Sequence, residues 1–230
     1  MATQFANGKI VTDGLVLALN AADRNSYPGS GTTWIDITGR GSNLTLYNGP
    51  TFSSSNGGTL VFDAVDDYAR VSSPNITLGT SARTLMGWFK ATTSVYGCIF
   101  GFGNSPSTST YGSFELWNYA DPLSIHFAGG SISSGFNLST NTNKWIMVVM
   151  TFDGTTAIIS ITCDGVVYTG SSTVPLNTST GNFSVNKSAY GSEGGGLAGS
   201  WASILTYNRV LSSAEVTQNY NAIKSRLGLK

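Results

Sequence analysis

The stretch that decides the fold of this chain covers residues 144–170 and reads KWIMVVMTFDGTTAIISITCDGVVYTG. Residues 145–152 are apolar at almost every position, as expected of a central strand that is covered on both faces. Asp153-Gly154 and Asp164-Gly165 are turn dipeptides, because glycine accepts a positive φ and aspartate bonds to its own backbone. The stretch therefore predicts three consecutive antiparallel strands, the second of them over 157–163.

The rest of the chain consists mainly of short apolar runs that are broken by glycine, asparagine, serine and proline. This alternation is typical of an all-β sandwich or barrel. No change in composition marks a linker, and the Gly- and Ser-rich stretches are short enough to be loops. We therefore predict one domain over residues 1–230.

The C-terminal part differs, because it carries the pattern of an amphipathic helix over about residues 213–227. Ser212 and Glu215 have the spacing of a capping box, and Gly228 is a suitable terminating residue. Apolar residues follow at helical spacing from Val216 to Leu227. We expect this helix to pack on its own domain rather than to bind a partner.

Composition excludes several classes of function. Charged residues make up only 10% of the 230 residues, against about 25% in typical soluble domains, and 12 basic residues balance 12 acidic ones. A chain without net charge or a basic patch is not expected to bind nucleic acid. No apolar run approaches the roughly 18 residues that a membrane span requires, so we expect no membrane insertion.

The beginning of the chain, MATQFANGKIVTDG, lacks a basic segment followed by an apolar core. We therefore expect no signal peptide and synthesis in the cytoplasm. Cys98 and Cys163 both lie in apolar runs, which favours buried thiols, with a single disulfide between them as the alternative.

Several motifs occur in an order that resembles a known family. They are LVFDAVDDYARV (60–71), RTLMGWFKA (83–91), the stretch at 144–170 and LAGSWASILTYNRVLSSAEV (197–216). Together they resemble the laminin-G-like or concanavalin A-like jelly-roll family, and the segment at 25–52 is similar to a variant found in bacteriophage structural proteins. The resemblance implies an all-β jelly-roll sandwich of two antiparallel sheets packed face to face.

Asp63, Asp66 and Asp67 form an acidic cluster that allows three interpretations: a turn, a calcium site or a catalytic site. The resemblance implies that this segment joins two strands at a corner, where aspartates bond to backbone amides. Related domains hold calcium with carboxylates from several loops. The family's acidic pair in the last motif is absent here, and its glycine after Phe-Asp is replaced by Ala64. We therefore favour the turn, with calcium as the alternative and no other cofactor.

We predict no catalytic residues. Glycoside hydrolysis needs two carboxylates that face one bond, and glucanases of this superfamily space them along one strand. The chain has only three glutamates. Glu215 is used by the capping box, Glu193 lies in a predicted loop, and Glu115 has no acidic residue two positions further on. The single histidine, His126, has no partner nearby in sequence, and a histidine satisfied within a strand is the preferred interpretation.

A sugar-binding site remains a candidate, since sugars stack on aromatic rings and bond to amides and carboxylates. The segment STYGSFELWNYAD offers Tyr111, Trp117, Asn118, Tyr119 and Asp121. In an alternating strand Trp117 and Tyr119 share one face and Asn118 takes the other. The alternative is that the aromatic face belongs to the core.

These observations predict a non-enzymatic structural protein of a phage virion, made in the host cytoplasm. The resemblance carries most of this hypothesis, and a neutral, hydroxyl- and amide-rich surface fits it. The expected partners are other virion proteins of the capsid or tail, further copies of the chain and host-surface glycans. The alternative is a free lectin-like module that binds carbohydrate.

Overall fold

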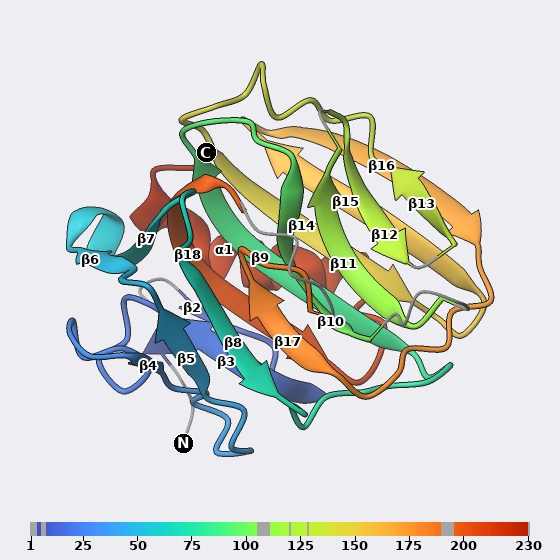
Figure 1. The fold of residues 1–230 in the computed structure, drawn as a ribbon, viewed down its shortest axis with the longest axis horizontal. Helices are drawn as coiled ribbons and strands as arrows, with labels where there is room; N and C mark the ends of the chain where they lie inside the picture. The colour runs from blue at the N-terminus through green and yellow to red at the C-terminus, as the bar shows by residue number, and fades with distance from the viewer. Residues whose placement is uncertain are drawn as a thin grey trace.

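The computed structural model describes residues 4–5, 8–104, 111–119, 121–127, 129–189 and 196–229. It contains two antiparallel sheets packed face to face and one C-terminal helix (Figure 1). The all-β sandwich predicted from the sequence is thereby confirmed.

The front sheet has the strand order β13-β12-β11-β10-β17-β8-β5-β4. Its strands are, in chain order, β4 (Thr33–Trp34), β5 (Leu44–Tyr47), β8 (Tyr68–Ser72), β10 (Gly97–Gly103), β11 (Ser113–Asn118), β12 (Leu123–Phe127), β13 (Gly130–Ser133) and β17 (Asn182–Val185). Strands distant in the sequence are thus neighbours in the sheet, as β10 and β17 show.

The back sheet has the order β16-β15-β14-β9-β18-β7-β6, and β3 pairs with β18. Its strands are β3 (Leu15–Asn20), β6 (Thr51–Ser53), β7 (Thr59–Asp63), β9 (Arg83–Ala91), β14 (Trp145–Phe152), β15 (Thr156–Cys163), β16 (Val166–Thr173) and β18 (Ala198–Tyr207). The three-stranded meander predicted at 144–170 is β14, β15 and β16. A short helix η1 (Ser55–Gly57) precedes β7, and β1 (Gln4–Phe5) pairs with β2 (Gly8–Lys9) next to the C-terminal helix.

Strand β14 is apolar on both faces because each face has its own covering layer. Ile146 and Val148 belong to the core between the two sheets. Met147 and Val149 belong to a second apolar cluster on the outer side, which includes Ile223 of the helix. A strand that is buried on both sides gains from apolar residues at every position.

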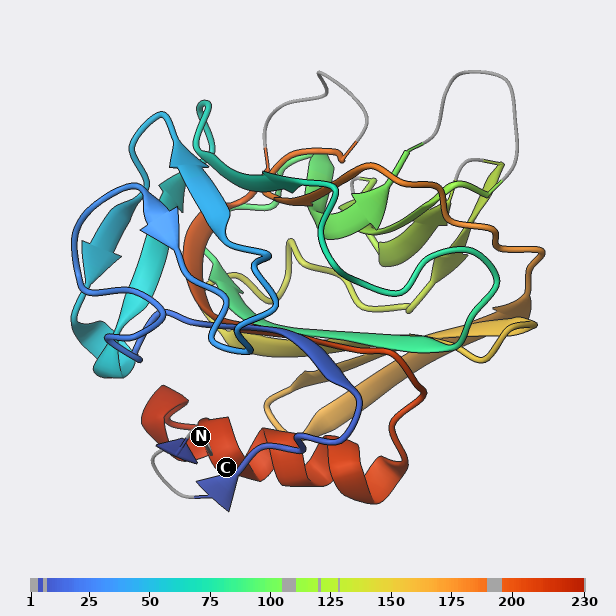
Figure 2. The same cartoon turned by 90° about the horizontal axis from the view of Figure 1, so that it is seen from below.

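The helix α1 (Ser213–Leu227) lies against the outer side of the back sheet (Figure 2). The Ser212 hydroxyl accepts the Glu215 N–H, and the Glu215 carboxylate accepts the Ser212 N–H, so the predicted capping box is present. Gly228 ends the helix with a φ of 71°. Ile223 and Leu227 are buried against the domain, which confirms that the helix packs on its own chain.

Two further expectations bear on the rest of the molecule. Cys98 and Cys163 are both buried free thiols, as predicted. Within the described ranges, no helix has the length and apolar character that crossing a membrane requires.

Candidate functional site

Strand β11 places alternate side chains on the two faces of the front sheet. Phe114 and Leu116 lie in the core between the sheets, so Glu115 and Trp117 project from the outer face. The pairing of β11 with β12 sets His126 directly opposite Glu115. The register of the sheet therefore assembles, on the outer face, residues that are far apart in the sequence.

Four rings gather at this end of the outer face, from Tyr96, Trp117, Tyr119 and His126; we call them the aromatic platform. Trp117 and Tyr119 stack with ring centroids 5.2 Å apart and planes 12° from parallel. Tyr96 meets both rings edge-on, at 6.0 Å and 5.4 Å. The His126 ring lies 5.3 Å from Trp117 and 5.5 Å from Tyr119. Tyr96 is 54% exposed whereas Trp117 is 3% exposed, so Trp117 supports the rings that reach the surface.

The predicted arrangement of three of the sugar-site candidates agrees with the structure. Trp117 and Tyr119 share the outer face, and Asn118 points to the other side. Asn118 is buried and donates from its amide nitrogen to the Val95 carbonyl, 2.8 Å away. Asn118 therefore holds the loop that carries Tyr96 instead of facing the same surface as the rings.

The other two candidates lie outside the platform. The Asp121 carboxylate accepts the N–H groups of Leu138 and Ser139, at 2.5 Å and 3.1 Å, and so ties two loops together. The Tyr111 ring packs on Phe127, with centroids 5.4 Å apart, and is partly buried against the core. The structure thus brings together two of the five candidates.

Sequence reasoning did not connect Tyr96 and His126 with Trp117. Tyr96 precedes β10 in a loop, and His126 was interpreted as a satisfied strand residue. The link between them is the strand register, in which Trp117 pairs with Cys98 on one side and with Ser124 on the other. Alternation in β12 could have placed His126 on one face, but only pairing decides which residues it meets.

Glu115 is fully buried at the base of this face. Its Oε2 accepts the Trp117 indole N–H at 3.0 Å, and its Oε1 accepts the Ala189 N–H at 2.7 Å. The Ser188 hydroxyl at 3.3 Å and the Cys98 thiol at 3.5 Å also donate to Oε1. Burial raises the pKa of Glu115, and the donated hydrogen bonds oppose that rise. Burial also raises the pKa of the Cys98 thiol, with the nearby Glu115 charge as a second cause.

Burial favours the uncharged form of His126. Burial lowers its pKa below the ordinary value of 6.5, because a charged imidazolium loses solvation there. Its Nδ1 is buried and has no hydrogen-bond partner among the described residues. The platform thus presents neutral aromatic surface.

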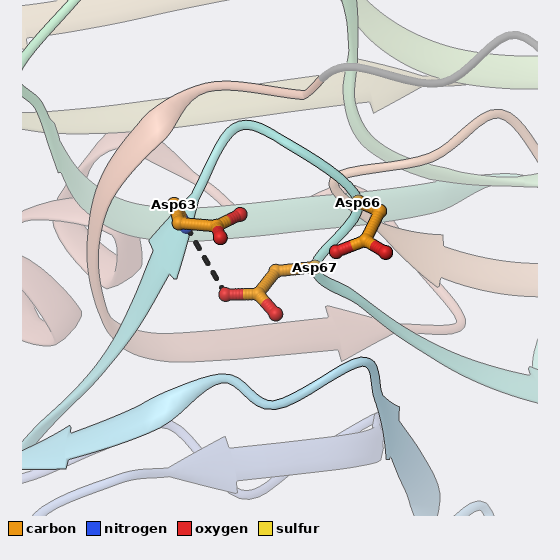
Figure 3. A group of neighbouring side chains, drawn as sticks. All are labelled: Asp63, Asp66 and Asp67. Carbon is orange, nitrogen blue, oxygen red and sulfur yellow. Dashed lines mark hydrogen bonds between the residues drawn. The ribbon is translucent and has the colours of Figure 1, made fainter.

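The acidic cluster lies in the turn between β7 and β8, and we call Asp63, Asp66 and Asp67 the acidic corner (Figure 3). Asp67 is buried and its Oδ2 accepts the Asp63 N–H at 3.1 Å. The Asp63 Oδ1 accepts the Val65 N–H at 2.8 Å, which closes an Asx turn. Two of the three carboxylates therefore bond to backbone amides of the turn, as the favoured interpretation expects.

The acidic corner also meets part of what calcium requires. One ligand atom of each aspartate lies within 4.8 Å of the others, and carboxylate oxygen is the ligand that calcium prefers. Burial is the main cause that raises the pKa of Asp67, and the charges of the two other aspartates add to it. A cavity of about 90 Å³ beside the corner is lined by Lys187 as well as by Asp66 and Asp67. The ammonium group of Lys187 disfavours a second cation there, and calcium remains a prediction.

Comparison with known proteins agrees with this architecture. A family model described as the concanavalin A-like lectin/glucanases superfamily matches residues 62–217. No curated protein matches the chain in sequence.

Three solved structures illustrate the likeness in fold. Domain 4 of AbnA, an extracellular arabinanase from Geobacillus stearothermophilus, in complex with arabinotriose, has a TM-score of 0.58 at 12% identity, over 89% of this chain and 97% of that one. A Trypanosoma rangeli sialidase has a TM-score of 0.65 at 17% identity, over 96% of this chain and 34% of that one. The binding domain of botulinum neurotoxin serotype D has a TM-score of 0.61 at 13% identity, over 91% of this chain and 51% of that one. The chain thus spans about a third of the sialidase and about half of the toxin domain.

Proposed function

Because this chain belongs to the concanavalin A-like lectin/glucanases superfamily, we propose that it binds carbohydrate through the aromatic platform on the outer face of its front sheet. The observation that carries the proposal is the clustering of four rings there, with Tyr96 54% exposed. Aromatic rings offer flat apolar surface to the apolar faces of sugars, and their polar edges accept or donate hydrogen bonds. An exposed group of aromatic side chains often marks a binding surface.

The chemistry of the platform favours a neutral sugar. Burial favours the uncharged form of His126, and the Glu115 carboxylate is fully buried. Ser131 and Ser133, both exposed on the neighbouring strand β13, supply hydroxyl groups. A ligand would therefore be held by stacking and by neutral hydrogen bonds.

We expect binding without hydrolysis. Glu115 is the glutamate that the described part of the chain places on this face, and it is fully buried. A general acid or a nucleophile must reach the glycosidic bond, and retaining or inverting hydrolysis needs a second carboxylate opposite it. Incubation with arabinan or β-glucan should release no reducing ends.

The test of the proposal is oligosaccharide binding by Tyr96→Ala and Tyr119→Ala. Arabinotriose and a wider array of neutral glycans are suitable probes for isothermal titration calorimetry, and an anionic sialylated oligosaccharide should bind more weakly than they do. We expect each variant to bind a recognised glycan about tenfold more weakly, which corresponds to roughly 1.4 kcal/mol of lost stacking.

The matched control is Tyr47→Ala. Tyr47 is also exposed, at 39%, and stacks on Tyr68 at the other end of the same sheet. The Tyr47→Ala variant should bind glycans with the same affinity as the wild-type protein. Equal losses in all three variants, or unchanged binding by Tyr96→Ala and Tyr119→Ala, would contradict a site at the platform.

Display on a phage virion is a separate prediction that rests on the sequence resemblance. It is compatible with glycan binding, since a particle protein can contact host glycans. Mass spectrometry of purified particles checks it: the chain should copurify with particles, and its presence only in the soluble lysate would contradict the virion role.

A further inference from the structure

The outer face of the front sheet contains a buried carboxylate that the binding of a neutral sugar does not by itself require. Glu115 is 0% exposed. A buried charge costs free energy unless hydrogen bonds compensate it. Since a glutamine or an apolar residue would avoid that cost, the contacts of Glu115 call for a physical explanation.

Its two carboxylate oxygens are directed at different parts of the molecule. Oε2 accepts the indole N–H of Trp117 on its own strand, at 3.0 Å. Oε1 accepts from Ala189 and Ser188, in a segment that crosses the outer face; we call residues 186–189 the covering segment. Hydrogen bonds to a charged acceptor are stronger than neutral ones, so this carboxylate holds both groups firmly.

The covering segment has further attachments that do not involve Glu115. The Arg70 guanidinium donates to the Ser188 carbonyl at 2.7 Å, and the Asn182 amide donates to the Ala189 carbonyl at 2.6 Å. Trp117, in contrast, has Glu115 as the partner of its indole N–H. Loss of the carboxylate therefore affects the orientation of Trp117 more than the position of the segment.

Trp117 transmits its orientation to the exposed rings. Tyr119 stacks almost parallel on it at 5.2 Å, and Tyr96 meets its edge at 6.0 Å. A rotation of the indole would displace both tyrosines, since close-packed side chains move together. Glu115 itself cannot contact a sugar because it is sealed from solvent.

We propose that Glu115 is a positioning residue of the carbohydrate site: its carboxylate fixes the Trp117 indole and thereby holds Tyr96 and Tyr119 in the arrangement that binds the sugar. The inference rests on the proposed function for its effect on binding. The other part of the inference, that Glu115 controls the orientation of the rings, depends only on the contacts of Glu115 and Trp117.

The experiment is Glu115→Gln, which keeps the shape of the side chain and removes its charge. The chain has five tryptophans, so ¹H–¹⁵N spectra show up to five indole signals, and Trp117→Phe identifies the one from Trp117. In Glu115→Gln we expect that signal to move upfield, the ring signals of Tyr96 and Tyr119 to shift, and glycan binding to weaken about tenfold. Glu115→Gln added to Trp117→Phe should weaken binding no further, because both changes break the same contact.

The matched control is Ser188→Ala, which removes a donor to Glu115 from the covering segment and leaves the Trp117 bond in place. It should leave the Trp117 signal and the affinity unchanged. A Trp117 signal that does not move in Glu115→Gln, or a moved signal with unchanged affinity, overturns the proposal. Additive losses in the double variant overturn it as well.

Failure of the proposed function is a distinct outcome. If the wild-type protein binds no glycan, carbohydrate binding is refuted, and the Tyr96 and Tyr119 ring signals still decide whether Glu115 orients the platform. If Glu115→Gln does not fold, Glu115→Asp keeps the charge but shortens the side chain, which withdraws the carboxylate from the Trp117 indole N–H and leaves the indole ring in place. The tyrosine signals should then shift in that variant, and unchanged signals contradict the positioning role.

Discussion

At the scale of the residue, Ala64 occupies a backbone conformation that suits glycine. Its φ is 65°, in the left-handed region, at the turn between β7 and β8. The motif that this segment resembles has glycine at that position. A side chain with a Cβ costs about 1 kcal/mol there, because it crowds the following carbonyl oxygen. The hydrogen bonds of Asp63 and Asp67 on either side hold the turn in spite of this cost.

We predict that Ala64→Gly raises the free energy of unfolding by up to about 1 kcal/mol, measured in urea. The relief of strain exceeds the greater freedom of glycine in the unfolded chain. Ala214→Gly, at an exposed helical position, is the control and should lower stability. A loss of stability in Ala64→Gly would show that the turn carries no strain at this residue.

The acidic corner yields a second prediction at this scale. Because Asp63 and Asp67 bond to turn amides, we expect EDTA to leave the melting temperature almost unchanged. The Asp66 side chain adds a negative charge to the cluster, so Asp66→Asn should be neutral or slightly stabilising. A large fall in melting temperature with EDTA, restored by calcium and absent in Asp66→Asn, would instead establish a calcium site.

At the scale of the element, helix α1 begins at a charged junction. Arg209 donates two hydrogen bonds to the Glu215 carboxylate, at 2.6 Å and 2.9 Å, and Glu215 also accepts the Ser212 N–H. These bonds, with Arg209 the main cause, lower the pKa of Glu215 from 4.5 to about 2. The charge favours the helix start, where it also meets the positive end of the helix dipole.

This junction predicts a pH dependence of stability. The folded-state pKa of Glu215 lies below its unfolded value, so its contribution is fully present above about pH 4.5 and is lost as the pH falls toward 2. Glu215→Gln keeps a side chain that can complete a capping box but cannot titrate, and it should flatten the loss of stability in this window. Thermal unfolding between pH 2 and 6 measures the effect. Identical pH profiles for both proteins would contradict it.

At the scale of the whole molecule, the back sheet is shared by two apolar clusters. One fills the space between the sheets, and the other lies between the back sheet and α1. Among the described residues, no helix covers the outer face of the front sheet (Figure 2). The platform, Glu115 and the covering segment all lie on that face, which is why polar and aromatic side chains can gather there without disturbing either core.

The sequence by itself determined the elements whose signals are local. The Asp-Gly turns predicted β14, β15 and β16, and the capping box predicted the start of α1, because turns and caps depend on residues only a few positions apart. Alternation within β11 likewise placed Trp117 and Tyr119 on one face.

Only the tertiary structure decided which side chains meet across strands. Tyr96 and His126 join Trp117 through the register of β10, β11 and β12, and Glu115 reaches Ala189 through a segment 74 residues later in the chain. Such contacts depend on pairing between distant segments, and the composition of each segment leaves that pairing open. The burial of Glu115 has the same origin. In the sequence Glu115 is an ordinary strand residue, and its carboxylate is buried because the covering segment packs across it.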